Sequence, residues 1–159
     1  MIRLSLVSVG MVEETASVIL VLRAPEQRRL LVMEVGLMEG RAIAIEAEEV
    51  KTPRPLTHEL THRVLEALRA TLTQVVIHEF RDKTFYANLD LRTADGAEVL
   101  VDARPSDAIA LAIRTGAPIL ATPEVLEMAG IDEDESLDDA ELDATDDVDD
   151  DEEDGNILH

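Results

Sequence analysis

The sequence contains no cysteine, no tryptophan and only three aromatic side chains, Phe80, Phe85 and Tyr86. The lack of cysteine excludes disulfides, thiolate zinc sites and cysteine nucleophiles. Because aromatic residues are so few, the hydrophobic core must consist of Val, Ile, Leu and Ala. No apolar run approaches the roughly 20 residues of a membrane-spanning helix, and the first residues lack the charged and apolar regions of a signal peptide. We therefore expect a cytoplasmic protein without a membrane span.

Several motifs that define enzyme classes are also missing. There is no G-x-x-x-x-G-K-[ST] phosphate loop, no G-x-G-x-x-G turn and no G-x-S-x-G nucleophile elbow. We find no basic stripe with interleaved aromatic residues of the kind that lines RNA-binding sheets. The function must therefore rest on less standard groupings of polar residues.

The charge of the chain is divided very unevenly. Residues 132–159 hold 16 of the 35 acidic residues and none of the 14 Lys and Arg residues, which leaves 19 acids and 14 bases in residues 1–131. The dense runs of Asp and Glu favour disorder, because like charges repel and little apolar surface is available for burial. We therefore predict a domain over 1–131 and a disordered acidic tail over 132–159. The tail either solubilises the protein, mimics nucleic acid or collects divalent cations.

The domain contains two similar series of elements. Short β-branched runs separated by polar turns predict three strands in each half, and helical patterns follow each set of strands. Strands are expected over 2–9, 15–23, 30–34, 72–80, 83–91 and 98–102, with helices over 37–49, 57–70, 104–114 and 123–129. The pattern predicts an α+β fold of duplicated β-β-β-α-α units that pack as one compact domain.

Short matches between the halves support this duplication. Residues 15–22 align with 84–91 at an offset of 69, and residues 42–45 align with 108–111 at an offset of 66. The helix around 108–113 is apolar on almost every side, so it is either central or covered by another subunit. We predict a homo-oligomer, most simply a homodimer.

The helix over 57–70 contains an H-E-x-x-H match, from His58 and Glu59 to His62. Such a pair of histidines can share one zinc ion, with the glutamate as general base of a metalloprotease. The context is poor, because two prolines place His58 in the first helical turn. His58, His62, Glu66 and Arg69 are expected to form one solvated polar face. It lies beside an apolar stripe of Leu60, Val64, Leu65, Leu68 and Leu72. A zinc protease is therefore a remote alternative.

Two strand-to-helix or loop-to-helix corners carry the remaining candidate chemistry. Asp102 to Asp107 joins a strand to a helix, with Arg104 between two acids, and Pro53 to His58 repeats the Arg-Pro step at Arg54. Free N–H groups at helix starts favour anions, Arg binds phosphate in a bidentate manner, and carboxylates suit Mg²⁺ or Mn²⁺. Helix capping explains the same residues equally well. Glu39, in the first turn of its helix, is a further candidate ligand.

These segments resemble the bacterial bifunctional nuclease family over roughly residues 1–131. The resemblance rests on Thr84 to Ala87, on Asp102 to Arg114, and upstream on Pro53 to His58 and on Gly36 with Glu39. It implies an α+β domain with DNase and RNase activity and no settled mechanism. Glu59 stands where the family tends to have Asp, which makes the H-E-x-x-H match an accident of drift.

These observations predict a metal-assisted phosphodiesterase, and the resemblance implies that it acts on DNA and RNA. Asp102, Asp107 and Glu39 are predicted to hold Mg²⁺ or Mn²⁺. Asp102, Asp107 and His58 are the predicted catalytic residues, with His58 as general acid or base. Arg54 and Arg104 are predicted to bind the phosphate from two converging corners. The alternative is a non-catalytic oligomeric module that regulates through partners.

Overall fold

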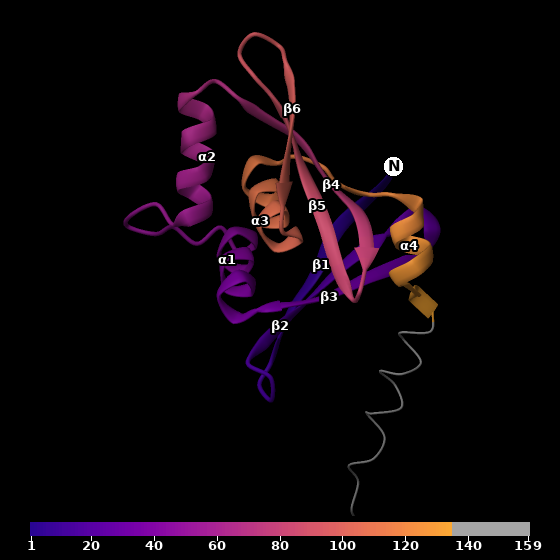
Figure 1. The fold of residues 1–159 in the computed structure, drawn as a ribbon. Coiled ribbons are helices and arrows are strands. Elements are labelled where there is room, and N and C mark those ends of the chain that lie inside the picture. Colours follow the sequence, from indigo (N-terminus) through magenta and orange to yellow (C-terminus); the bar gives the residue numbers. More distant parts are fainter. Residues whose placement is uncertain (135–159) are drawn as a thin grey trace, which may run out of the picture.

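The computed structural model describes residues 1–134 of the 159-residue chain. Two antiparallel three-stranded meanders form most of one eight-stranded sheet (Figure 1). The first meander consists of β1 (Ile2–Val12), β2 (Ser17–Ala24) and β3 (Arg29–Gly36), with a short 3-10 helix, η1 (Pro25–Gln27), between the last two. The second consists of β4 (Thr71–Arg81), β5 (Thr84–Arg92) and β6 (Glu98–Ala103). The six predicted strands are thus confirmed, with small shifts at their ends.

Helices follow each meander, as predicted. The first is followed by α1 (Leu37–Ala47) and α2 (Thr57–Ala67), and the second by α3 (Pro105–Thr115) and, later, α4 (Pro123–Ala129). Helices α1 and α2 end two and three residues earlier than predicted. Glu49 and Arg69, just beyond them, adopt left-handed backbone angles of φ 53° and 56° that stop a right-handed helix.

Two three-residue strands were not predicted. They are β7 (Ile119–Ala121) and β8 (Gly130–Asp132), and the sheet order is β6-β5-β4-β7-β1-β2-β3-β8. Strand β7 pairs in parallel with β4 and antiparallel with β1, so it joins the two meanders into one sheet. The fold is the predicted α+β class, with a strand inserted between the last two helices.

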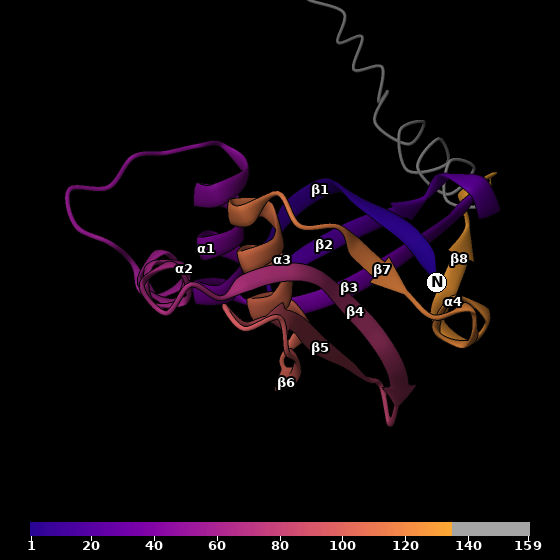
Figure 2. The same cartoon turned by 90° about the horizontal axis from the view of Figure 1, so that it is seen from above.

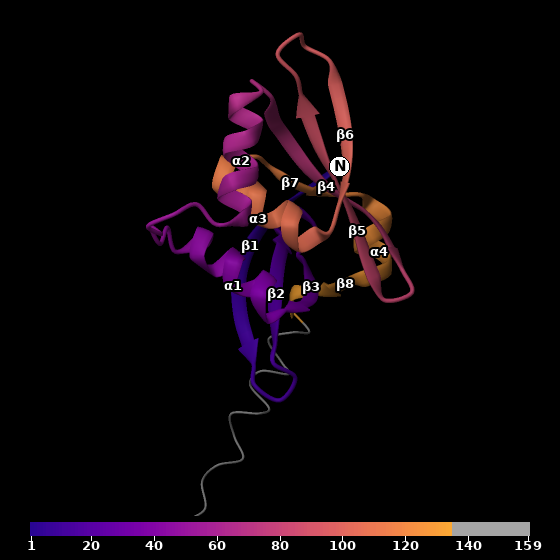
Figure 3. The same cartoon turned by 60° about the vertical axis from the view of Figure 1, so that its left-hand side comes forward.

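Helix α3 lies at the centre of the molecule. It packs against α1, α2, β4 and β5, and Figures 2 and 3 show it enclosed by these elements. Ala108, Ile109 and Ala110 are fully buried. Its apolar surface is therefore explained within one chain, and it no longer requires a second subunit.

The predicted apolar stripe is split: Leu72 is buried in β4, whereas Leu60, Val64 and Leu68 face outward. These side chains are 54%, 48% and 68% exposed, and α2 contains no buried residue. The polar side of α2 instead faces the domain, since His58 and Glu59 are only 15% and 19% exposed. The expectation of a solvated polar face was therefore wrong for His58.

The structured region continues past the predicted boundary at residue 131. Asp132 pairs with Arg29 at the end of β8. Glu133 forms an ion pair with Arg23, and Asp134 with Arg28. The first three residues of the predicted tail therefore belong to the domain, and the rest of the tail lies outside the described residues. Within residues 1–134, no helix is long and apolar enough to cross a membrane.

Candidate functional site

Three helix starts meet at the candidate site. Helix α1 supplies Glu39 from its first turn, α2 supplies His58, and α3 supplies Asp107, with Arg104 as its N-cap residue. Pro105 occupies the first helical position of α3, where its missing N–H costs nothing. Neither Asp102 nor Ser106 caps this helix, because α3 has no side-chain cap hydrogen bond. The acids and the arginine are thus free for contacts between elements.

Arg104 bridges the start of α1 and the start of α3. Its Nη1 donates to Glu39 Oε1 at 2.9 Å, its Nε donates to Asp107 Oδ2 at 2.7 Å, and its Nη2 donates to Asp107 Oδ1 at 3.2 Å. The side chain is nevertheless 63% exposed. A guanidinium has five N–H donors, so two donors remain for another ligand.

His58 lies on the other side of the same carboxylate. Its Nε2 is 2.9 Å from Asp107 Oδ1, and because an ionised carboxylate only accepts, Nε2 is the donor. Burial acts to raise the pKa of Asp107, but hydrogen bonds from Arg104 and His58 outweigh it and hold that pKa below its usual value. Asp107 therefore stays ionised near neutral pH and can orient the imidazole.

The cluster carries more negative than positive charge. Glu39 is also kept ionised, because its own backbone N–H and the Arg104 guanidinium lower its pKa. The pKa of Arg104 is raised by the hydrogen bonds from its side chain to Asp107 and Glu39. Arg104 is the one permanent cation among these four residues, and it faces two carboxylates. The two carboxylates neutralise the charge of Arg104, so a phosphate bound through its two remaining N–H donors gains little from charge attraction.

An open cleft of about 1140 Å³ begins at this cluster. Glu39, Asp102 and Arg104 line one end, and residues of β2, β3, α4 and the β4–β5 hairpin line the remainder. Strands from the two meanders share this cleft although β7 and β1 separate them in the sheet, because the sheet curls. His58 and Asp107 stand behind Arg104 and are not part of the cleft lining.

All three aromatic side chains of the protein line this cleft. They are Phe80, Phe85 and Tyr86, at the end of the β4–β5 hairpin. The Phe80 and Phe85 ring centroids lie 4.5 Å apart, and the Arg81 guanidinium lies 5.1 Å from the centre of the Tyr86 ring. The sequence analysis missed this grouping, although three aromatic and two basic residues fall within positions 80–86.

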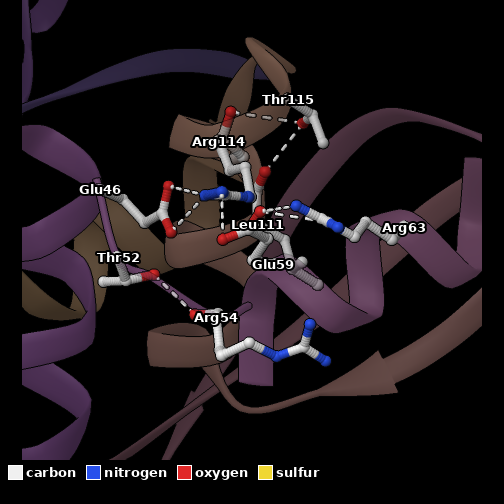
Figure 4. A network of polar contacts seen from close by, with 9 residues as sticks. Glu46, Thr52, Arg54, Glu59, Arg63, Leu111, Arg114 and Thr115 are labelled. Atoms are coloured by element: carbon white, nitrogen blue, oxygen red, sulfur yellow. Dashed lines mark hydrogen bonds and ion pairs between the residues drawn. The ribbon is translucent and has the colours of Figure 1, made fainter. Parts of the chain in front are cut away.

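Arg54 does not join the cluster. Its side chain is exposed, and within residues 1–134 its guanidinium makes no hydrogen bond or ion pair. Its backbone carbonyl accepts a hydrogen bond from the Thr52 hydroxyl at 2.8 Å (Figure 4). The corners that meet are therefore those of Glu39 and of Arg104, with His58 added from α2.

The predicted metal ligands do not form a metal site as they stand. Glu39 and Asp107 both accept hydrogen bonds from Arg104, and within residues 1–134 the Asp102 side chain makes no hydrogen bond or ion pair with either. Across the described part of the chain, no group of three His, Asp or Glu residues is arranged to hold a metal ion. The predicted Mg²⁺ or Mn²⁺ set therefore does not fit this arrangement of side chains.

The H-E-x-x-H match has a structural explanation. Glu59 accepts from Arg63 at 2.6 Å and pairs with Arg114 at 3.1 Å, while Arg114 also binds Glu46 at 2.6 Å (Figure 4). The hydrogen bond from Arg63 is the main reason why the pKa of Glu59 is lowered. A glutamate held by two guanidinium groups is a poor general base, and it serves here to join α1, α2 and α3. Zinc analysis of the purified protein should find no stoichiometric metal.

The fold and the cluster define a curled-sheet α+β domain with a polar site at the head of an aromatic-lined cleft. The model of the bifunctional nuclease domain matches residues 20–134. The chain belongs to this family, as the sequence resemblance implied.

Two relatives from Mycobacterium tuberculosis, in strains CDC 1551 and H37Rv, are both described as uncharacterised proteins. Each is 40% identical to this chain over 113 residues, which is 71% of this chain. The chain spans 66% of the length of these relatives. These relatives support membership of the family, but their descriptions indicate no activity.

Proposed function

We propose that the protein is a nuclease that hydrolyses phosphodiester bonds in DNA and RNA. Membership of the bifunctional nuclease domain family supports the class of reaction. The single structural observation that carries the proposal is the continuous chain of contacts from Glu39 through Arg104 and Asp107 to His58. It places an oriented imidazole next to the arginine that lines the cleft and could bind a phosphate there.

Each residue of the chain has a distinct proposed role. Arg104 binds the scissile phosphate through its two remaining N–H donors and stabilises the charge that develops in the transition state. Asp107 holds His58 by Nε2, which leaves Nδ1 of the neutral ring to accept a proton from the attacking hydroxyl or water. Glu39 positions Arg104 from the opposite side. In many nucleophilic active sites, a third group likewise orients the base that activates the nucleophile.

Divalent-metal assistance by Asp102, Asp107 and Glu39 stays a prediction. Since Arg104 occupies two of these three carboxylates, no step of the proposed reaction is assigned to a metal. A divalent ion would neutralise the negative balance of the cluster and activate water. Dependence of cleavage on Mg²⁺ or Mn²⁺ would be the sign that the carboxylates rearrange around such an ion.

The test is a cleavage assay on labelled single-stranded RNA and DNA with Mg²⁺, Mn²⁺, Zn²⁺ or a chelator. Highly purified wild type is compared with the double variant Asp107→Asn, Arg104→Ala and with Arg54→Ala, whose arginine lies outside the cluster. We expect the double variant to lose cleavage and Arg54→Ala to retain it. Cleavage retained by the double variant would overturn the proposed site.

The second candidate is a non-catalytic oligomeric module that regulates through partners. The exposed stripe of Leu60, Val64 and Leu68 favours it, because large exposed apolar patches mark interaction surfaces. In this case Arg104, Glu39 and Asp107 serve only to join the helices. Highly purified wild type would then cleave neither RNA nor DNA with any of the metals, and the homodimer prediction would become its central property.

A further inference from the structure

None of the three aromatic residues of this protein is fully buried in the core. The largest fully buried side chains are all Leu, Ile and Val, and of the three aromatic rings only Phe85 packs against the core. Phe80 and Tyr86 are only partly buried, and both contribute to the cleft wall. A chain with so few aromatic residues thus places every one of them on the surface of a single cleft.

The turn beside these rings carries an unusual residue. Asp82 and Lys83 form the β4–β5 turn with φ angles of 51° and 60°, where Asn and Gly are normally preferred. The two-residue hairpin loop imposes these angles, which are unfavourable for lysine. Lys83 is one of only two lysines in the chain, and it lines the cleft. The turn thus places a cation at the cleft, next to the aromatic rings.

We propose that this cleft binds single-stranded nucleic acid, and the proposal rests on the nuclease function proposed above. Bases stack on Phe80, Phe85 and Tyr86, while Lys83 at one end and Arg104 at the other contact phosphates. Aromatic side chains stack on bases of any sequence, provided that the bases are not already stacked in a duplex. The cleft therefore selects against double-stranded substrates.

The size of the cleft fits an extended ligand. Its volume of about 1140 Å³ exceeds the range of about 300–1,000 Å³ typical of small-molecule pockets, and it is open to solvent. It also joins the aromatic hairpin to the Arg104 cluster in one continuous space. A strand bound across the rings thus has a phosphate at Arg104.

The charge of the cleft predicts how such a ligand is held. Glu34, Glu39 and Asp102 share the lining with Lys83 and Arg104, so the cleft is not strongly basic. Stacking must then contribute most of the affinity. Because each phosphate contact contributes a salt slope of about −0.7 on single strands, two contacts predict a slope near −1.4.

The intrinsic fluorescence of Tyr86 can report on this interaction. Tyr86 is the only tyrosine and there is no tryptophan, so intrinsic fluorescence reports on the cleft alone. Wild type with a chelator present is titrated with a single-stranded oligonucleotide of about 12 residues, with the matching duplex, and with an abasic strand of equal length. The abasic strand has the same phosphates but no bases.

We expect the single strand to quench Tyr86 and to bind at least about tenfold more tightly than the abasic strand or the duplex. Equal affinity for the abasic strand would show that stacking contributes nothing. Equal affinity for the duplex would show that the cleft does not select single strands. Either result would overturn the proposal.

Variants show which residues contribute to binding. Their affinity is measured by the fluorescence anisotropy of a labelled single strand. Tyr86→Leu should weaken binding about tenfold, whereas Tyr86→Phe keeps the ring and should retain it. Lys83→Gly relieves the left-handed strain and should bind more weakly while being at least as stable. Lys51→Ala removes the other lysine, which lies outside this cleft, and should leave binding unchanged. Unchanged binding in Tyr86→Leu would overturn the proposal.

Two variants distinguish a failure of the binding proposal from a failure of the proposed chemistry. His58→Asn removes the proposed base but lies outside the cleft lining, so it should bind the single strand normally and not cleave it. If it cleaves normally while Tyr86→Leu loses binding, the proposed chemistry is wrong and the cleft assignment stands. If it loses cleavage while Tyr86→Leu binds normally, the cleft assignment is wrong and the chemistry stands.

Discussion

The imidazole of His58 and the carboxylate of Asp107 lie 2.9 Å apart, although 49 positions separate them in the chain. The contact joins the first turns of α2 and α3, and it places an oriented proton acceptor beside an arginine that binds the same carboxylate. Neither residue is held there by helix capping. The contact is the reason why we assign these residues a role in chemistry.

For the cleavage rate, the arrangement of the guanidinium donors of Arg104 should matter more than its charge. Arg104→Lys keeps a cation but cannot donate to Glu39 and to both oxygens of Asp107 at once. We expect cleavage to fall at least about tenfold, because the cation is no longer fixed for the phosphate. Steady-state cleavage rates with wild type and Arg104→Lys provide the comparison. A lysine variant as active as wild type would mean that charge alone suffices.

Gly40 should be required for the position of α1. A Cβ atom at this residue would lie 2.3 Å from Cβ of Val18 on β2, so α1 packs directly on the strand. Gly40→Ala must push the helix away, and we expect a destabilisation of about 1–3 kcal/mol in thermal or urea unfolding. Gly10→Ala is the matched control, since its added Cβ meets nothing within 4 Å. Equal stability of both variants would contradict this packing.

Acid should destabilise the protein through the cluster. The pKa values of Asp107 and Glu39 are lowered in the folded state. Their stabilising contribution is therefore present at neutral pH and is lost as the pH falls through the lowered values, below about pH 4. We expect the melting temperature to drop in this range, and to drop less in Arg104→Ala. An identical acid dependence in both proteins would show that these pairs contribute nothing.

The outward stripe of α2 is the surface that we expect to form the homodimer. Three partly exposed apolar residues on one helix, Leu60, Val64 and Leu68, are costly to leave in water. Light scattering at micromolar concentration should give a dimer for wild type and a monomer for the variant Leu60→Lys, Leu68→Lys. A monomeric wild type would end the homodimer prediction.

The sequence predicted the fold well where elements are long. Six strands and four helices follow from periodicity and turn residues, as at Pro105 and Pro123, which both open helices. Strands β7 and β8 were missed because three residues are too few to show alternation. The stripe on α2 shows a further limit, since periodicity identifies residues on one face but not which face turns inward.

The candidate site was predicted in part. Glu39, His58, Arg104 and Asp107 were all selected from residue chemistry, and all four meet in the structure. Arg54 was selected by the same reasoning from an Arg-Pro step, yet it points into solvent, because a shared dipeptide does not fix the direction of a side chain. The aromatic cleft was missed because its walls come from both meanders, which only the curl of the sheet brings together.

The most direct test of the proposed chemistry compares two histidines on one helix. His58 contacts Asp107, whereas His62, one turn later, lies 3.5 Å from the exposed Glu66. The cleavage rate of single-stranded RNA is measured for His58→Asn and for His62→Asn. We predict a loss of about 100-fold or more for His58→Asn and little change for His62→Asn. Equal rates in the two variants would contradict the role of the His58–Asp107 pair.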